Sequence, residues 1–383
     1  MSTLRTYRIK PDALNELIRS LQREHYTVIG PTLRGAAIVL DKISSTSDLP
    51  IGKTDEQAPA QYRLVDHAPA TFFGASVGPQ SWKQFLFPPV LKFVSAKKNG
   101  TSYEMTDPLH EAGKPVRYAF LGVRACDLSA IQIQDMVFGG GAYRDSAYLR
   151  LRHEAFIIAV NCTHAGGTCF CSSLRTGPRA RTGFDLALTE VVDKEHFLLV
   201  EVGTEKGEAL LAGVTKEIAS DDEREGADRA VRAAAQLTGR SLEPEHTREI
   251  LYSNAEHPRW DVVGQRCLSC ANCTMVCPTC FCTTVEDVTD LTGAEAERLR
   301  KWDSCFTLDF SYIHGGSVRS SSRARYRHWL THKLASWMDQ FGTIGCVGCG
   351  RCITWCPVGI DITEEFRVIR ETYLINTKGK STT

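Results

Sequence analysis

Two stretches of the sequence carry four cysteines each at the same spacing. They read Cys267-Leu-Ser-Cys270-Ala-Asn-Cys273-Thr-Met-Val-Cys277-Pro278 and Cys346-Val-Gly-Cys349-Gly-Arg-Cys352-Ile-Thr-Trp-Cys356-Pro357. Both fit C-x2-C-x2-C-x3-C-P, in which three thiolates surround one iron–sulfur cubane and the fourth thiolate ligates another. The sequence therefore predicts two [4Fe–4S] clusters that exchange their fourth ligands.

This exchange assigns four thiolates to each cluster. Proline after each fourth cysteine fixes φ and withholds one N–H, and glycine in the second motif lets the backbone approach a cubane. Structural zinc is the alternative, but zinc sites use paired C-x2-C knuckles with four cysteines to one ion. We expect the first cluster on Cys267, Cys270, Cys273 and Cys356, and the second on Cys346, Cys349, Cys352 and Cys277.

Four further cysteines lie in the N-terminal half of the chain. Buried cysteines can pack as small apolar residues, but these four lie in predicted loops, and glycines separate some of them. We expect a third [4Fe–4S] cluster here, with zinc as the alternative. Its predicted ligands are Cys126, Cys162, Cys169 and Cys171, while Cys280, Cys282 and Cys305 receive no role.

Two short apolar runs would position the third set of cysteines. Residues 118–123 and 155–160 have buried-strand character and lead to Cys126 and Cys162, and residues 128–137 between them look helical. A β-α-β unit follows from this order. Its two strands would end at the carboxyl edge of a sheet, where α/β folds place ligands.

The remaining pattern predicts two domains. Residues 1–240 look like a mixed domain of α+β or α/β class, with an amphipathic helix after Pro11 and strands at 26–29 and 36–40. The charged, alanine-rich segment 221–239 is typical of an exposed helix at a domain junction. Residues 241–383 are expected to form an all-helical ferredoxin-type domain, with helices at 302–310 and 326–341.

A basic cluster falls between the two cysteine motifs. It has two interpretations: a solvated helix face, or compensation for the negative charge of thiolate-bound clusters, which would raise their reduction potential. The cluster consists of Arg319, Arg323, Arg325, Arg327 and Lys333.

Composition excludes several classes of function. The 383 residues hold 45 basic and 45 acidic side chains, which argues against nucleic-acid binding through bulk charge. No apolar run approaches the roughly 20 residues of a membrane span, and the start lacks a signal-peptide core. Fifteen cysteines without such a signal favour metal ligation in a reducing, cytoplasmic setting over disulfides. Dinucleotide and P-loop motifs are absent, and we expect no catalytic acid–base residue.

The chain resembles the iron–sulfur β subunit of cytosolic bifunctional NiFe hydrogenases (sulfhydrogenases) and, more distantly, a subunit of anaerobic sulfite reductase. The N-terminal segments make this resemblance specific; one departure is Ala125, where proline is expected before Cys126. The resemblance is carried by Leu49-Pro-Ile-Gly-Lys-Thr-Asp-Glu-Gln, Gly122-Val-Arg-Ala-Cys126-Asp-Leu and segments 162–171, 267–282 and 346–357.

The resemblance implies an electron-transfer subunit of a heteromeric complex. Its partners would be a flavin-containing NAD(P)H subunit and the small and large hydrogenase subunits, with no nucleic acid and no membrane span. Alternatives are an electron-transfer subunit of a sulfite reductase or formate dehydrogenase type of complex, a catalytic subunit with a substrate-binding metal in its N-terminal domain, and a structural zinc protein.

Overall fold

A computed structural model describes residues 5–107, 113 and 116–378. Its centre is an eight-stranded mixed sheet in the order β12-β1-β11-β10-β9-β8-β2-β3. Strands β2, β8, β9 and β10 run parallel to one another, and antiparallel strands extend both sides. The strands are β1 (Thr6–Ile9), β2 (Thr27–Arg34), β3 (Ala37–Lys42), β8 (Tyr118–Arg124), β9 (Phe156–Val160), β10 (Leu186–Val192), β11 (His196–Val202) and β12 (Glu217–Ile218).

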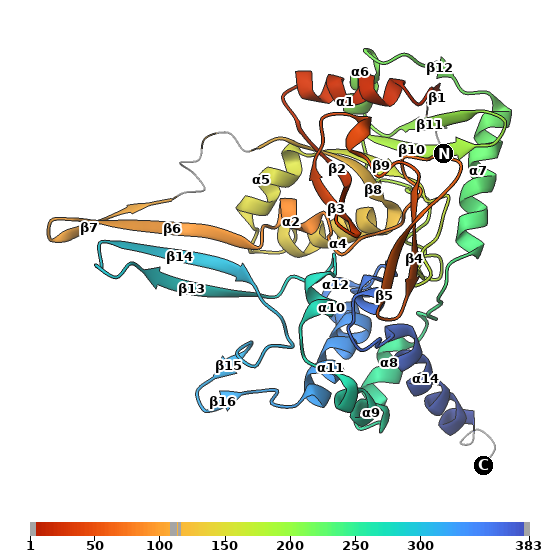
Figure 1. The fold of residues 1–383 in the computed structure, drawn as a ribbon. Coiled ribbons are helices and arrows are strands. Elements are labelled where there is room, and N and C mark those ends of the chain that lie inside the picture. Colours follow the sequence, from red (N-terminus) through yellow and green to blue (C-terminus); the bar gives the residue numbers. More distant parts are fainter. Residues whose placement is uncertain (1–4, 108–112, 114–115, 379–383) are drawn as a thin grey trace.

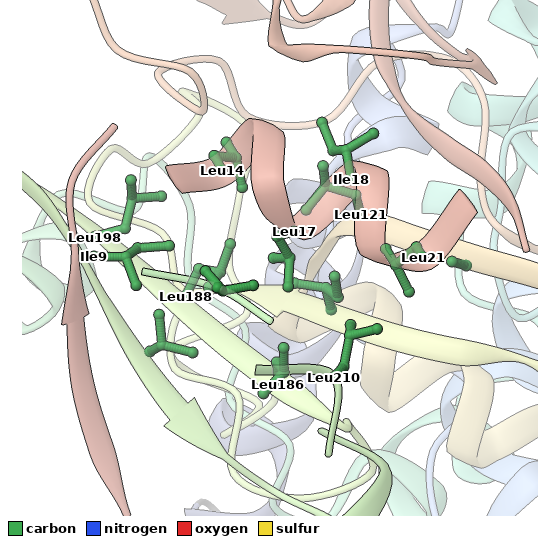
Figure 2. Close-up of a cluster of buried hydrophobic side chains, with 14 of the residues drawn as sticks. Ile9, Leu14, Leu17, Ile18, Leu21, Leu121, Leu186, Leu188, Leu198 and Leu210 are labelled. Carbon is green, nitrogen blue, oxygen red and sulfur yellow. The ribbon is translucent and has the colours of Figure 1, made fainter. Parts of the chain in front are cut away.

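Helices cover both faces of this sheet, because its central strands are apolar on both sides. On one face, α1 (Ala13–Arg23) buries Leu14, Leu17 and Leu21, and Figure 2 shows them directed at the strand residues Leu186 and Leu188. Next to α1 lies α6 (Glu205–Leu211). The opposite face is covered by α2 (Lys83–Leu86), α4 (Ala125–Gly139) and α5 (Ser146–Glu154), while α7 (Asp221–Gln236) packs on β10 and β11.

The predicted β-α-β unit is confirmed. Strands β8 and β9 are parallel neighbours, with Arg124 opposite Val160, and α4 follows β8 directly. Cys126 lies in the first turn of α4, and Cys162 follows the end of β9. Both cysteines therefore lie at one edge of the sheet.

The C-terminal part has its own helical core, packed around Trp260, Trp329 and Phe366. Lys333 lies in a π-helical segment, and residues 369 and 373 extend the core along the last helix. Its helices are α8 (Thr247–Ser253), α9 (Arg259–Arg266), α10 (Asn272–Met275), α11 (Ser322–Thr331), the π-helix His332–Ser336, α12 (Trp337–Phe341), α13 (Arg351–Thr354) and α14 (Ile362–Lys378).

The expectation of an all-helical C-terminal domain is wrong. Residues 283–302 form a hairpin of β13 (Thr283–Thr289) and β14 (Glu295–Trp302), and β15 (Tyr312–Ile313) pairs with β16 (Gly316–Ser317). Trp302 ends a strand, so the helix predicted at 302–310 is absent as well. Both faces of the hairpin are partly solvated, so charged residues occur on both and the apolar alternation typical of a strand is missing.

Hairpin β13–β14 joins two strands from the N-terminal half. Strand β14 pairs with β6 (Val90–Asn99), which pairs with β7 (Ser102–Thr106), in the order β13-β14-β6-β7. We call this sheet the arm, and it projects from the body (Figure 1). A further hairpin, β4 (Lys53–Ala58) with β5 (Gln61–Asp66), lies near α13. No described helix is long and apolar enough to cross a bilayer.

Candidate iron–sulfur sites

The first set of thiols lines one cavity. Helix α9 ends beside Cys267, the short helix α10 carries Cys273, and α13 leads to Cys356 from the second motif. With Cys270 they surround about 460 Å³ of space, which apolar side chains close on the inner side. Backbone N–H groups already point at two sulfurs: Ser269 N lies 3.4 Å from Cys267 Sγ, and Ile360 N lies 3.3 Å from Cys356 Sγ.

The electrostatics of this cavity favour a bound cation. Burial raises the pKa of the Cys273 thiol well above its usual value, and the neighbouring thiols of Cys267, Cys356 and Cys270 raise it further. Thiolates gathered here would repel one another in a poorly solvated space. Iron removes this penalty because its positive charge compensates the thiolates, so the donor set fits a cluster.

The second set gathers around the loop that precedes α13. Cys346, Cys349 and Cys352 all interact electrostatically with Cys277, which the chain delivers from the other motif. All four thiols are poorly exposed. The structure therefore brings together the four residues that the exchanged-ligand pattern requires, and the same holds for the first set.

The ammonium group of Lys333 contacts a thiol of the second set. Its Nζ lies 3.3 Å from Cys277 Sγ and donates to Thr279 Oγ1 at 3.1 Å and Gly345 O at 2.8 Å. Burial lowers its pKa, but thiols led by Cys277 and Cys280 raise the pKa above its ordinary value. The side chain is 5% exposed, so this positive charge is held inside the protein.

The third set lies at the carboxyl edge of the large sheet. Cys126 and Cys171 pack in one cluster with Cys349 of the second set. Cys169 interacts with Cys162, Cys171 and Cys349, and burial raises its pKa well above normal. Thus the four N-terminal thiols predicted as ligands share one region, and this region adjoins the second set.

Glycines allow the 162–171 loop to touch the second motif. Phe170 N donates to Gly348 O at 2.8 Å. Gly348 has φ +63°, and a Cβ there would lie 2.6 Å from Cys171 N. Gly350 has φ +75°, and its Cβ would lie 2.5 Å from Thr168 O. Any other residue type at these positions would force the two thiol-bearing loops apart.

The 49–57 segment braces the same junction. Thr168 Oγ1 donates to Gln57 Oε1 at 2.8 Å, and Thr354 Oγ1 donates to it at 3.0 Å. Gln57 Nε2 donates to Asp55, which also accepts from Ser76 Oγ at 2.7 Å. One amide thus connects the third-set loop to helix α13 of the second motif.

A buried ion pair ties α4 to the second motif. Arg351 Nη1 lies 2.8 Å from Asp127 Oδ1, and Arg351 Nη2 donates to Asp127 Oδ2 at 2.9 Å. Both side chains are at most 3% exposed. Because Asp127 follows Cys126 and Arg351 precedes Cys352, this bidentate pair fixes two thiols relative to each other.

The basic cluster of the sequence separates into two roles. Arg323 pairs with Glu256 and Asp261, and Arg327 pairs with Glu256, at the surface. Arg325 is buried and donates to backbone carbonyls, including Phe306 O at 3.0 Å. The solvated-face interpretation therefore fits Arg323 and Arg327, whereas charge compensation fits Lys333, which contacts Cys277.

Sequence reasoning missed several residues that shape these sites. Asp127, Arg351, Gln57 and Lys83 gave no motif of their own, although three of them lie in segments that carry the family resemblance. Lys83 is 4% exposed, donates to Cys280 O at 3.1 Å and lies 3.8 Å from the centre of the Trp302 ring. Among the described residues, no three His, Cys, Asp or Glu side chains are arranged to hold a single metal ion.

Comparison with known proteins adds two findings. The profile of a family described as a 4Fe-4S dicluster domain matches residues 266–360. The chain is also 33% identical over 259 residues to sulfhydrogenase 2 subunit beta of Pyrococcus furiosus, which covers 67% of this chain and 75% of the relative. No solved structure gives a significant match.

Proposed function

The chain belongs to the family of iron–sulfur β subunits of sulfhydrogenases, and we propose that it relays electrons between a flavin subunit that reacts with NAD(P)H and a NiFe hydrogenase module. It is an iron–sulfur electron-transfer subunit with [4Fe–4S] clusters. Each bound cluster supplies reversible one-electron transfer. The chain itself contributes the thiolates, their burial and the hydrogen bonds that set the reduction potential.

In this proposal each thiol set holds one cluster. Cys267, Cys270, Cys273 and Cys356 hold the first, and Cys346, Cys349, Cys352 and Cys277 hold the second. Cys126, Cys162, Cys169 and Cys171 hold a third. Residues 1–240 and 241–383 remain the proposed units, with the third cluster in the N-terminal one.

The observation that carries the proposal is the continuity of the three sets. The third set contacts the second through Cys349, and the second approaches the first through Cys277, which interacts electrostatically with Cys273. Electrons could then pass through the chain in the order third, second, first, or in reverse. Cys270 is exposed, which places the first set near the surface and makes it one end of the relay.

The sequence also supports the need for partners. It contains no motif for a nicotinamide or flavin nucleotide. We therefore expect the isolated chain to be brown and to lack NAD(P)H-driven dye reduction and hydrogenase activity.

The partners are tested by purifying the native complex under anaerobic conditions. We expect a flavoprotein and both hydrogenase subunits to copurify with the chain, and the complex to couple NAD(P)H oxidation to hydrogen evolution. Copurification with a sulfite-reducing or formate-oxidising subunit would replace this assignment by the corresponding alternative. A colourless chain loaded with zinc would refute the electron-transfer role.

The third cluster is tested by counting iron in the reconstituted chain. Three cubanes require about twelve iron atoms per chain, and two require about eight. Cys126→Ser and Cys171→Ser should each lower the count by about four, whereas Cys280→Ser should leave it unchanged. About eight iron atoms in the unmodified chain, with the four N-terminal thiols free to alkylate, would eliminate the third cluster.

A further inference from the structure

Two thiols outside the proposed ligand sets meet at the base of the arm. Cys282 precedes β13, and Cys305 follows β14. The ladder of these strands begins with Thr283 opposite Trp302, and Asp303 N donates to Cys282 O at 2.8 Å just beyond it. The pairing of the hairpin thus carries Cys282 and Cys305 to the same place.

The two side chains are hydrogen-bonded to each other. Cys282 Sγ accepts hydrogen bonds from both the thiol and the backbone N–H of Cys305. The thiol hydrogen bond is the main cause that lowers the pKa of Cys282 to about 7, and the same bond raises the pKa of Cys305. A substantial thiolate fraction at Cys282 therefore faces an S–H group at neutral pH, which is the arrangement that thiol oxidation requires.

The surroundings supply positive charge that is not paired with carboxylates. Lys83 and Lys333 are both buried, and within the described part of the chain neither forms an ion pair with Asp or Glu. Both ammonium groups interact with the thiols of this region, Lys83 with Cys280 and Cys282, and Lys333 with Cys282 and Cys305. Buried cations without carboxylate partners favour thiolates over thiols.

The pair also lies beside the proposed electron path. Cys305 interacts electrostatically with Cys273 of the first set, and Lys333, which interacts with both thiols, contacts Cys277 of the second. The base of the arm is therefore next to both C-terminal clusters.

We propose that Cys282 and Cys305 form a reversible dithiol–disulfide couple that exchanges electrons with the neighbouring iron–sulfur clusters. On reduction, one S–S bond breaks and two S–H bonds form, taking up two protons and two electrons. Two reduced clusters each give one electron and become oxidised, and the reverse reaction returns these electrons. The inference rests on the proposed function for its electron source. It gives a one-electron relay a site that stores electrons in pairs.

The experiment uses the reconstituted full-length chain. Samples are poised anaerobically with dithionite or with an oxidised mediator dye, quenched in acid, alkylated and digested for mass spectrometry. We expect a peptide linked through Cys282 and Cys305 in the oxidised sample, and two alkylated cysteines in the reduced one. Cys282→Ser and Cys305→Ser should abolish the linked peptide, while the matched variant Cys280→Ser should retain it.

Two results would overturn the proposal. One is alkylation of both thiols at every potential. The other is loss of about four iron atoms in Cys282→Ser and Cys305→Ser, because these residues would then be cluster ligands. Iron content and electron paramagnetic resonance report the clusters independently of the peptide. An iron-free wild-type chain would therefore count against the proposed function, while poise in a glutathione buffer would still show whether the disulfide forms.

Discussion

Single buried charges control both the potential and the stability of this protein. The clearest case is Lys333, whose ammonium lies 3.3 Å from Cys277 Sγ. A reduced cluster carries one more negative charge than an oxidised one, so a fixed cation favours reduction. A unit charge about 4 Å away interacts by about 4 kcal/mol at an effective dielectric constant of 20, which corresponds to a shift on the order of 100 mV.

Replacement of Lys333 by methionine should therefore lower the potential of one cluster by that order. The measurement is a redox titration followed by electron paramagnetic resonance. Arg327→Met is the matched control, since Arg327 pairs with Glu256 at the surface, and its removal should leave every potential within about 20 mV. An unshifted set of potentials in Lys333→Met would show that the ammonium does not sense a cluster.

The Arg351–Asp127 pair should matter chiefly for stability. Asp127→Asn leaves a buried guanidinium without its counter-charge, which should cost about 3–5 kcal/mol of unfolding free energy. Asp41→Asn removes a partner of Arg34 in an exposed pair and should cost less than about 1 kcal/mol. Denaturant unfolding of both variants measures the difference, and equal midpoints would contradict this role for the buried pair.

At the scale of elements, short helices decide which cluster receives each fourth thiolate. Helices α10 and α13 each span four residues and carry the chain from the third cysteine of a motif toward the fourth. They contact one another, which is why Cys277 and Cys356 end beside the opposite motif.

This geometry predicts the outcome of replacing Cys277. The variant Cys277→Ser should lose the cluster held by Cys346, Cys349 and Cys352, whose potential is the one that responds to Lys333→Met. Cys356→Ser should lose the other cluster. Iron analysis with electron paramagnetic resonance distinguishes the two, and retention of the Lys333-sensitive signal in Cys277→Ser would rule out the exchange.

The contact between the 162–171 loop and the second motif can be tested at Gly348. Alanine there brings a Cβ to 2.6 Å from Cys171 N, so Gly348→Ala should displace the loop and lower the iron content by about four atoms. Gly100 has the same φ of +63°, but a Cβ at that position would meet nothing within 4 Å. Gly100→Ala therefore carries the backbone strain alone, about 1 kcal/mol, and should keep its iron.

Local patterns in the sequence predicted much of this arrangement. The apolar periodicity of α1 and the buried runs of β8 and β9 have local causes, and so does the spacing within each cysteine motif. The arm was missed because its strands are charged on both faces and pair with segments far away. Gln57 and Asp127 were missed as bracing residues because a lone amide or carboxylate acquires that role only from its tertiary neighbours.

For the whole molecule, the large sheet and the C-terminal helical core are joined by buried polar contacts and by a shared sheet. Arg351, Gln57 and Gly348 all lie at contacts between segments more than a hundred residues apart. The thiol sets are therefore ordered only when both halves of the chain have folded against each other. A rigid spacing between redox centres follows from this, because no thiol set depends on one loop alone.

The arm has a further consequence for how the chain is made. Strands β6 and β7 leave the ribosome early, but their partner β14 is complete only at Trp302, nearly two hundred residues later. At about 5–20 residues per second, the open edge of β6 waits roughly ten to forty seconds for its neighbour. During synthesis the nascent protein thus exposes an unpaired strand edge, the kind of surface that chaperones protect and that otherwise aggregates.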